Sequence, residues 1–251
     1  MSLKEILGNN PGNVEDYVKA FGSPRYVKQN DVYVPGNVNG KTKIFYNKKL
    51  YQALQDCLDE DYKPLYMPEL ADRRINLNED DEIWNNWFIA PSVRVTGRTK
   101  QGNAVVVYAH IPNYFSNPEN IKNALGNLRN GAGSMPQEEF YNLLNQEDNE
   151  RVFVIDYSDL KNSSNGMIKV DKALEHPQTI PFLGGRGRAE QYLEKFRKIK
   201  GDKIGIYYSN DLDDTARGRL LFLYSSRSGL DGDYDLDYIG RFLRVAAEPQ
   251  E

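Results

Sequence analysis

The sequence predicts an α+β fold: a mixed, largely antiparallel sheet with flanking helices, in a single compact domain with an irregular N-terminal segment. The order of expected elements is mixed, with a hairpin, two helices, a strand, a helix and then three strands, which is typical of this class. The links between the last three strands are short, and short links favour antiparallel neighbours. A chain of 251 residues with 39% hydrophobic residues can also bury a sizeable core.

The first ninety residues are expected to be irregular apart from two short helices. The first spans residues 14–21, capped by Asn13 and stopped by Gly22 and Pro24. The second spans 48–58, with its apolar residues on one face. We therefore expect residues 1–90 to form an N-terminal segment or subdomain, residues 91–247 the α+β core and residues 248–251 a tail.

The middle of the chain has clearer patterns. Two β-rich segments, 92–98 and 103–111, are joined by a glycine-closed turn, and the second is so apolar that we expect a central strand. A helix is expected over 118–129, with Pro118 at its first position. Ser134 and Gln137 resemble a capping box for the next helix, and residues 151–157 read as another buried strand.

The last hundred residues begin with the clearest helix. Residues 188–200 carry one apolar stripe and a basic end, and Gly201 stops them. Strands are expected over 203–208, 218–224 and about 238–245, as antiparallel neighbours.

Composition excludes several classes of protein. The net charge of −4 is too close to neutral for a surface that binds polyanions as a whole, so a nucleic-acid partner is not favoured. A single cysteine, Cys57, excludes a disulfide framework and a multi-cysteine metal site. The sequence contains neither a signal-peptide pattern nor a long apolar run, which predicts a soluble, intracellular (cytoplasmic) protein without a membrane partner.

A glycine-rich loop before the helix at 188–200 is the first candidate site. Its glycines allow positive φ angles, and the helix start offers free N–H groups that bind phosphate or carboxylate. Two arginines of the loop could grip the same anion. The candidate ligand-binding residues are Gly184, Gly185, Arg186, Gly187 and Arg188. The pattern is neither a dinucleotide-binding nor a phosphate-loop motif, and such glycines also make ordinary turns.

Two groups of aspartates lie downstream of expected strands. One comprises residues 211, 213 and 214, and the other alternates through 231, 233, 235 and 237. Such carboxylates could hold Mg²⁺ or Ca²⁺, and the candidate ligands are Asp211, Asp213, Asp231 and Asp233. An EF-hand is excluded, because Leu236 and Phe242 stand where that loop needs glycine and glutamate. Aspartate is also a favoured turn residue, which is the simpler interpretation.

Arginines accompany these aspartates. Arg217 and Arg219 are candidate ligand-binding residues, although they could instead neutralise the acidic residues in a salt-bridge network. If the arginines met the nearby tyrosines in space, the result would be a groove that stacks bases and holds phosphates; those tyrosines are Tyr207, Tyr208, Tyr224 and Tyr234.

His110 and Asp156 are the candidate catalytic residues. Each lies at the end of an expected strand, so they could form an acid–base pair if the two strands were neighbours. The alternative is a buried histidine bonded to a carbonyl group.

Two functions of different classes follow. The first is binding, and metal-dependent processing, of a small phosphate-bearing anionic ligand at the glycine–arginine loop and the aspartates. The second is a non-catalytic protein–protein interaction through a surface rich in Tyr and Arg, the residue types enriched at interface hot spots. The sequence leaves open whether the protein is an enzyme.

Overall fold

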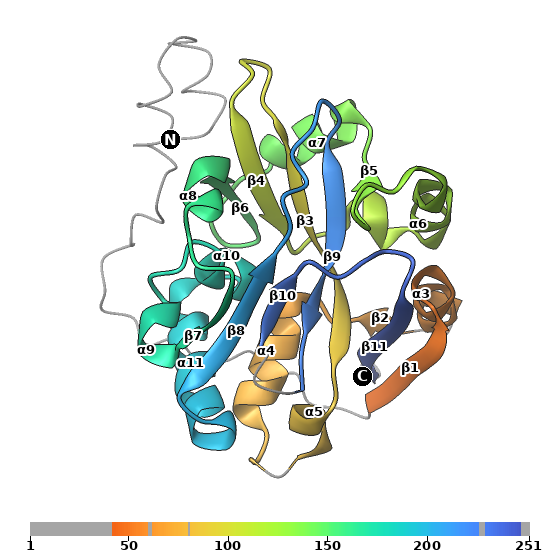
Figure 1. Ribbon diagram of the computed structural model, residues 1–251. Helices are drawn as coiled ribbons and strands as arrows, with labels where there is room; N and C mark the ends of the chain where they lie inside the picture. Colours follow the sequence, from red (N-terminus) through yellow and green to blue (C-terminus); the bar gives the residue numbers. More distant parts are fainter. Residues whose placement is uncertain (1–41, 60–61, 80, 226–228, 247–251) are drawn as a thin grey trace.

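The computed structural model describes residues 42–59, 62–79, 81–225 and 229–246, which form two sheets and their covering helices (Figure 1). The helix expected at 14–21 and the tail at 248–251 lie outside the described residues. The strands are β1 (Thr42–Lys49), β2 (Tyr62–Pro64), β3 (Phe88–Arg98), β4 (Ala104–Ala109), β5 (Gly133–Ser134), β6 (Val152–Asp156), β7 (Gly166–Lys169), β8 (Lys203–Tyr208), β9 (Arg217–Leu223), β10 (Leu230–Gly232) and β11 (Ile239–Ala246). The α-helices are α3 (Leu50–Asp59), α4 (Met67–Asn76), α5 (Glu82–Asn85), α6 (Pro118–Ala124), α7 (Gln137–Leu144), α8 (Tyr157–Lys161), α9 (Val170–Ala173), α10 (Thr179–Leu183) and α11 (Arg186–Lys200), and two short 3₁₀ turns span Tyr114–Ser116 and Leu125–Asn127.

The larger sheet has eight strands. Seven run in the order β6-β4-β3-β9-β10-β8-β7, and the short β5 pairs with β9. Its pairs are antiparallel except β8 with β10, which run parallel. The predicted α+β class with a mixed, largely antiparallel sheet is therefore confirmed.

The predicted arrangement of the last three strands is wrong. β8 and β9 are not hydrogen-bonded neighbours, because the three-residue β10 lies between them, antiparallel to β9 and parallel to β8. β11 leaves this sheet and pairs with β1 and β2 in a separate three-stranded sheet. Short links alone could not reveal this, because β10 is too short to have a recognisable alternating pattern.

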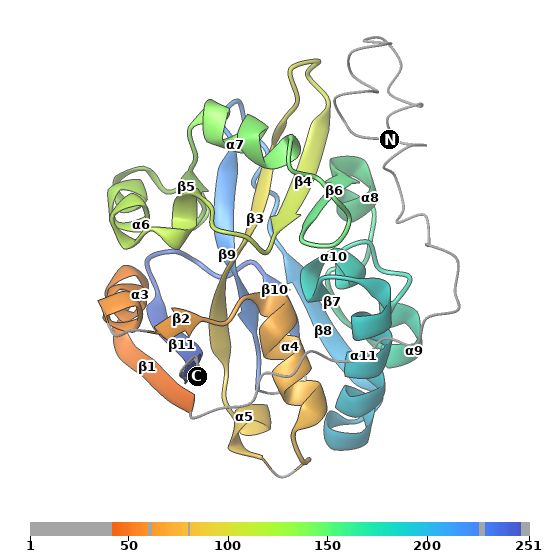
Figure 2. The same cartoon turned by 180° about the vertical axis from the view of Figure 1, so that it is seen from behind.

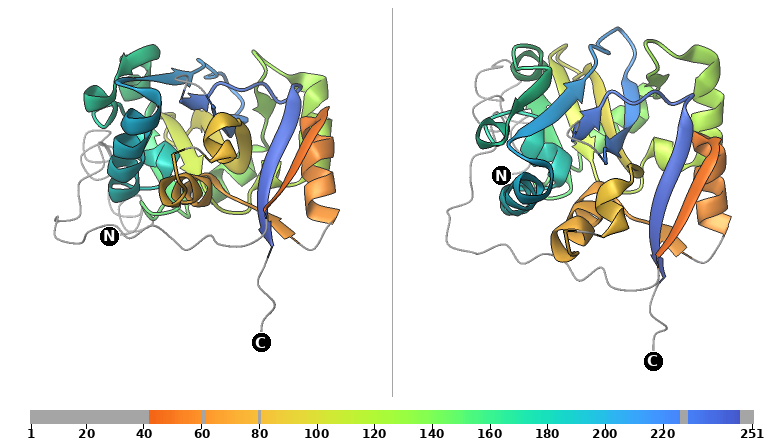
Figure 3. Two further views of the ribbon diagram at one scale, coloured as in Figure 1. Left: turned by 90° about the horizontal axis from the view of Figure 1, so that it is seen from below. Right: turned by 60° about the horizontal axis from the view of Figure 1, so that its bottom comes forward.

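The small sheet joins distant parts of the chain. β1 pairs with β11 from Thr42↔Val245 to Lys49↔Ile239, and α3 packs against both (Figure 3). The expected boundary at residue 90 falls inside β3. Among the described residues, no helix is both long and apolar enough to cross a membrane.

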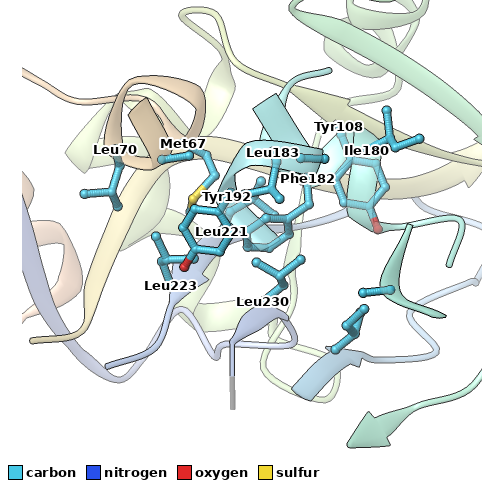
Figure 4. Close-up of a cluster of buried hydrophobic side chains, with 14 of the residues drawn as sticks. Met67, Leu70, Tyr108, Ile180, Phe182, Leu183, Tyr192, Leu221, Leu223 and Leu230 are labelled. Atoms are coloured by element: carbon cyan, nitrogen blue, oxygen red, sulfur yellow. The ribbon is translucent and has the colours of Figure 1, made fainter. Parts of the chain in front are cut away.

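Two hydrophobic cores lie on opposite faces of the large sheet. Helices α4, α10 and α11 cover one face, as seen from behind in Figure 2. Figure 4 shows this core, where helix residues such as Leu70, Phe182 and Tyr192 meet Leu221 and Leu230 of the sheet. Helices α3, α6 and α7 contribute to the other core.

The helix predicted over 188–200 is confirmed as α11, which begins two residues earlier. Its stripe is buried, and Gly201 ends it with a φ of 97°. The helix predicted over 118–129 is shorter, because it tightens into a 3₁₀ turn after Ala124. The residue before α7 is Pro136, so the predicted capping role of Ser134 is wrong; Ser134 belongs to β5.

Candidate functional site

A hollow of about 630 Å³ lies over β8 and β10, beside the loops that follow β9 and β10. In Figure 1 strands β8 and β10 lie in front of α4 and α11, and in Figure 2 they lie behind these helices. The lining of the hollow consists of tyrosine, aspartate and small polar residues, namely Asn130, Tyr207, Ser209, Tyr224, Asp231, Asp233, Tyr234, Asp235 and Tyr238. We call it the tyrosine–aspartate hollow.

The alternation of side chains along the strands creates the floor of this hollow. In the pairing of β8 and β10, Leu230 lies opposite Ile206 and both point into the core under α11. The next pair, Asp231 and Tyr207, points to the other face, because successive side chains of a strand alternate. A polar floor therefore lies directly behind an apolar core.

Stacked aromatic rings form one wall. Tyr234 stacks on Phe222 with ring centroids 4.3 Å apart, and Phe222 stacks in turn on Trp87 at 5.2 Å. Tyr224 meets the Phe222 ring edge-on at 4.4 Å, and Tyr238 meets Tyr234 edge-on at 5.3 Å. Each such contact contributes about 0.5–1.5 kcal/mol beyond area burial, so the wall is held in place before any ligand binds.

Two buried arginines lie next to the hollow. Arg94 of β3 and Arg219 of β9 stand opposite each other in the strand pairing, and both side chains are fully buried. Like charges directly opposite one another would destabilise a sheet. The carboxylate of Asp211 lies between them: its Oδ2 accepts from Arg94 Nη1 and from Arg219 Nε, each at 2.9 Å.

The remaining donors of the two arginines hold the loops that line the hollow. Arg94 Nη2 donates to the carbonyl of Ser209 at 2.8 Å. Arg219 Nη1 donates to the carbonyl of Asp233 at 2.8 Å and to Asp235 Oδ1 at 2.6 Å, and its Nη2 donates to the carbonyl of Asn130. One buried network thus fixes three segments that are distant in sequence.

A glycine is required where two of these segments touch. Gly131 has a φ of 80°, in the left-handed region, and a Cβ placed there would lie 1.8 Å from Oδ1 of Asp235. Its carbonyl accepts the N–H of Leu236 at 3.0 Å. The loop at 130–131 therefore packs closely against the loop after β10.

Two carboxyl groups of the hollow, those of Asp231 and Asp233, resist ionisation. Burial raises the pKa of Asp231 to about 7, and the nearby carboxylates of Asp233 and Asp235 act in the same direction. Burial also raises the pKa of Asp233. Asp231 is 6% exposed, and its Oδ1 accepts the N–H of Asp233 at 2.6 Å.

A second, larger hollow of about 710 Å³ lies elsewhere, beside the β3–β4 turn and the start of α7. Its lining includes Arg98, Lys100, Asp214 and Tyr141, with Lys100 Nζ lying 5.2 Å from the centroid of the Tyr141 ring. It has mixed charge and includes neither the buried arginines nor the stacked aromatic wall. The tyrosine–aspartate hollow is therefore the stronger candidate.

The predicted glycine–arginine loop lies between α10 and α11, against α4. Gly184 and Gly185 have φ angles of 74° and 128°, while Arg186 and Gly187 are already in α11. Arg188 Nε donates to Asp72 Oδ1 of α4 at 2.8 Å, and Arg186 Nε lies 2.7 Å from Glu190 Oε1. These arginines are engaged within the protein, so anion binding by this loop stays a prediction.

The two predicted groups of aspartates do come together, but around arginine. Arg219 contacts Asp211 of the first group and Asp233 and Asp235 of the second. Asp213 pairs instead with Arg217 and Arg129, at 3.0 and 2.9 Å. Among the described residues, no group of three or more His, Cys, Asp or Glu side chains is arranged to hold a metal ion, so a role for Mg²⁺ or Ca²⁺ stays a prediction.

His110 follows β4 and Asp156 is the last residue of the neighbouring β6, but the two are not brought together. In the antiparallel pairing of β4 and β6, Asp156 lies opposite Val105, whereas His110 follows Ala109 at the other end of the pair. Asp156 caps α8 by accepting the N–H of Ser158.

His110 itself is buried in the core. Its Nε2 donates to the carbonyl of Pro181 at 2.8 Å, which leaves Nδ1 to accept from Ser92 Oγ at 2.9 Å. Burial lowers the pKa of His110 to about 4. This is the bonding expected of a histidine that holds the structure together.

The sequence pointed to three of the four tyrosines of the hollow, as partners of arginine in a phosphate-holding groove. In the structure Arg219 is buried behind the lining, and the described residues of the lining include no Lys, Arg or His side chain. Sequence reasoning missed Asn130, Ser209 and Tyr238. Tyr238 could have been recognised from its position in the acidic run 231–238. No local pattern marks Asn130, because only the fold brings this residue near the hollow.

Comparisons with known proteins give one strong similarity. No protein-family model matches the chain, and no curated protein matches it. A solved structure concerning the accommodation of massive sequence variation in Nanoarchaeota by the C-type lectin fold is 51% identical, with a TM-score of 0.79. The match covers 82% of this chain and 98% of that one.

Proposed function

This chain belongs to the family of C-type lectin fold proteins, and on that premise we propose that it is a non-catalytic binding protein that recognises another protein through its tyrosine–aspartate hollow. The observation that carries the proposal is the construction of the hollow: four tyrosines and three aspartates line it, on strands β8 and β10 and on loops held by buried arginines. Tyrosine supplies large, rigid contact area at low entropic cost, as in antibody binding sites.

The relative from Nanoarchaeota supports a second part of the proposal. That structure concerns sequence variation accommodated by this fold. In this chain the network of Arg94, Asp211 and Arg219 holds the loops through carbonyl groups of Asn130, Ser209 and Asp233. Backbone carbonyls do not depend on side-chain identity, so we propose that the lining can change its specificity while the loops keep their shape.

The alternative, binding of a phosphate-bearing ligand, has weaker support. A phosphate site needs free N–H groups or cationic side chains. Arg186 and Arg188 pair with Glu190 and Asp72, and the hollow is lined by carboxylates, which repel an anion. A protein partner is therefore favoured over a small anionic ligand.

The test is to map where independently selected binding proteins attach. Binders are isolated from a displayed library against the whole chain, and each is measured against Tyr238→Ala and Tyr141→Ala. Tyr238 is an exposed lining residue of the tyrosine–aspartate hollow, and Tyr141 lines the larger hollow. We expect most binders to lose at least tenfold in affinity with Tyr238→Ala and to be unchanged with Tyr141→Ala. An even distribution, or a preference for the larger hollow, would contradict the proposal.

A further inference from the structure

We propose that the tyrosine–aspartate hollow receives a positively charged side chain, arginine or lysine, of the protein partner. The inference rests on the proposed function above and names the chemistry of its ligand.

The charged groups around the hollow do not balance. Among the residues that the structure describes, the hollow and the network next to it contain four carboxyl groups and two guanidinium groups, those of Asp211, Asp231, Asp233, Asp235, Arg94 and Arg219. Asp211 bonds both arginines and offsets one of their two positive charges. The other three carboxyl groups, those of Asp231, Asp233 and Asp235, are left with a single positive charge near Arg219. Within the described part of the chain, the lining contains no Lys, Arg or His side chain. The hollow therefore has an excess of negative charge that a ligand can neutralise.

The aromatic lining of the hollow also favours a cation. Tyr207, Tyr224, Tyr234 and Tyr238 surround these carboxyl groups. Tyrosine faces attract cations, and the attraction grows when the site is shielded from water. The planar guanidinium of arginine can stack on such a ring while it bonds a carboxylate with two N–H groups. Rings and carboxylates in one hollow thus select for a cationic group.

The lining and the size of the hollow suit a side chain better than a metal ion. The described residues contain no arrangement of three or more acidic or imidazole groups suited to a metal. The hollow, at about 630 Å³, is also far larger than an ion needs. Tyr238, which belongs to the lining, is 53% exposed and so offers apolar contact to the chain that carries the cation.

The affinity for a cation should also depend on pH. Asp231 is faced by Tyr207 and Tyr224, by Asp233 and Asp235 of the loop that follows β10 and by Arg219 from β9. Its raised pKa, about 7, leaves the carboxyl group partly protonated near neutral pH. A bound cation favours the ionised form, so binding should strengthen between pH 6 and pH 8.

The experiment uses the whole chain and three short peptides: acetyl-Gly-Arg-Gly-amide, the lysine equivalent and the citrulline equivalent. Citrulline has almost the shape of arginine but no charge. Binding is followed by the NMR shifts of residues 207–211 and 231–238. We expect saturable shifts with the arginine and lysine peptides, and binding at least about tenfold weaker with the citrulline peptide.

Matched variants locate the effect. Asp233→Asn removes a charge inside the hollow, and Asp237→Asn removes the same charge from an exposed position of the same loop. We expect the first to weaken the arginine peptide about fivefold and the second less than twofold, with circular dichroism confirming that both variants fold. Equal binding of citrulline, equal effects of the two variants, no binding of either cationic peptide, or saturation of the same shifts by millimolar CaCl₂ would each overturn the inference. If selected binders still map to the hollow in that case, the proposed function survives and only the charge preference fails.

Discussion

Replacing Asp231 by asparagine should make the protein more stable at alkaline pH. Asparagine keeps an oxygen for the N–H of Asp233, which Asp231 accepts at 2.6 Å, and it removes a carboxyl group that is costly to ionise. The pKa of Asp231 is raised from 3.8 to about 7, mainly by burial.

The direction of the pH dependence follows from the protons bound by the folded and the unfolded state. Between pH 4 and pH 7 the folded protein keeps a proton on Asp231 that the unfolded chain has released, so folding becomes less favourable as pH rises. A shift of about three pKa units corresponds to about 4 kcal/mol in total, of which about 2.5 kcal/mol develops between pH 5 and pH 8. The Asp231→Asn variant has no carboxyl group at this position, so it does not lose this stability as the pH rises.

The assay is urea unfolding of the natural protein and of Asp231→Asn at pH 5 and pH 8. The stability of the variant relative to the natural protein should rise by about 2.5 kcal/mol between the two pH values. Subtracting the natural protein removes the contribution of Glu147, whose pKa burial also raises to about 7. The control is Asp237→Asn, which changes an exposed carboxyl group of the same loop. A relative stability that is the same at both pH values would refute the reasoning.

Three further substitutions test the framework of the hollow, each by urea unfolding. Asp211→Asn leaves two buried guanidinium groups without their shared carboxylate and should cost about 3–5 kcal/mol; a loss under 1 kcal/mol would contradict the network. Tyr238→Ala removes a half-exposed ring and its edge-on contact with Tyr234 and should cost no more than about 1.5 kcal/mol, whereas a larger loss would mean that the rim is structural. Gly131→Ala should cost more than about 1 kcal/mol, because the positive φ and the contact with Asp235 both oppose a Cβ, and a neutral effect would show that the loop can move aside.

Local patterns in the sequence predicted the elements that bury one regular face. The strand at 103–111 and the helix at 188–200 were found because apolar periodicity over many residues reports directly on burial. β10 was not found, because three residues carry no period. β1 was not found either, because its pairing with β11 depends on contacts across the whole chain.

The sequence indicated residue types that line the candidate site, but not how these residues are arranged in space. The acidic run and its tyrosines marked the region, because such residues are unusual beside apolar strands. The pairing that places Arg94 opposite Arg219 depends on strand register, which the sequence does not display. The expected metal ligand Asp211 therefore proved to be the counter-ion of two arginines, a role that only the fold reveals.

The pairing of β1 with β11 has a consequence for synthesis on the ribosome. The two strands are about 200 residues apart in sequence, and contacts of such separation form late in folding. Until β11 has emerged, β1 lacks its central partner in the small sheet, and the buried face of α3 lacks one of the strands on which it packs. The nascent chain would thus hold an unpaired strand edge next to an incompletely covered apolar helix, the kind of surface that chaperones recognise.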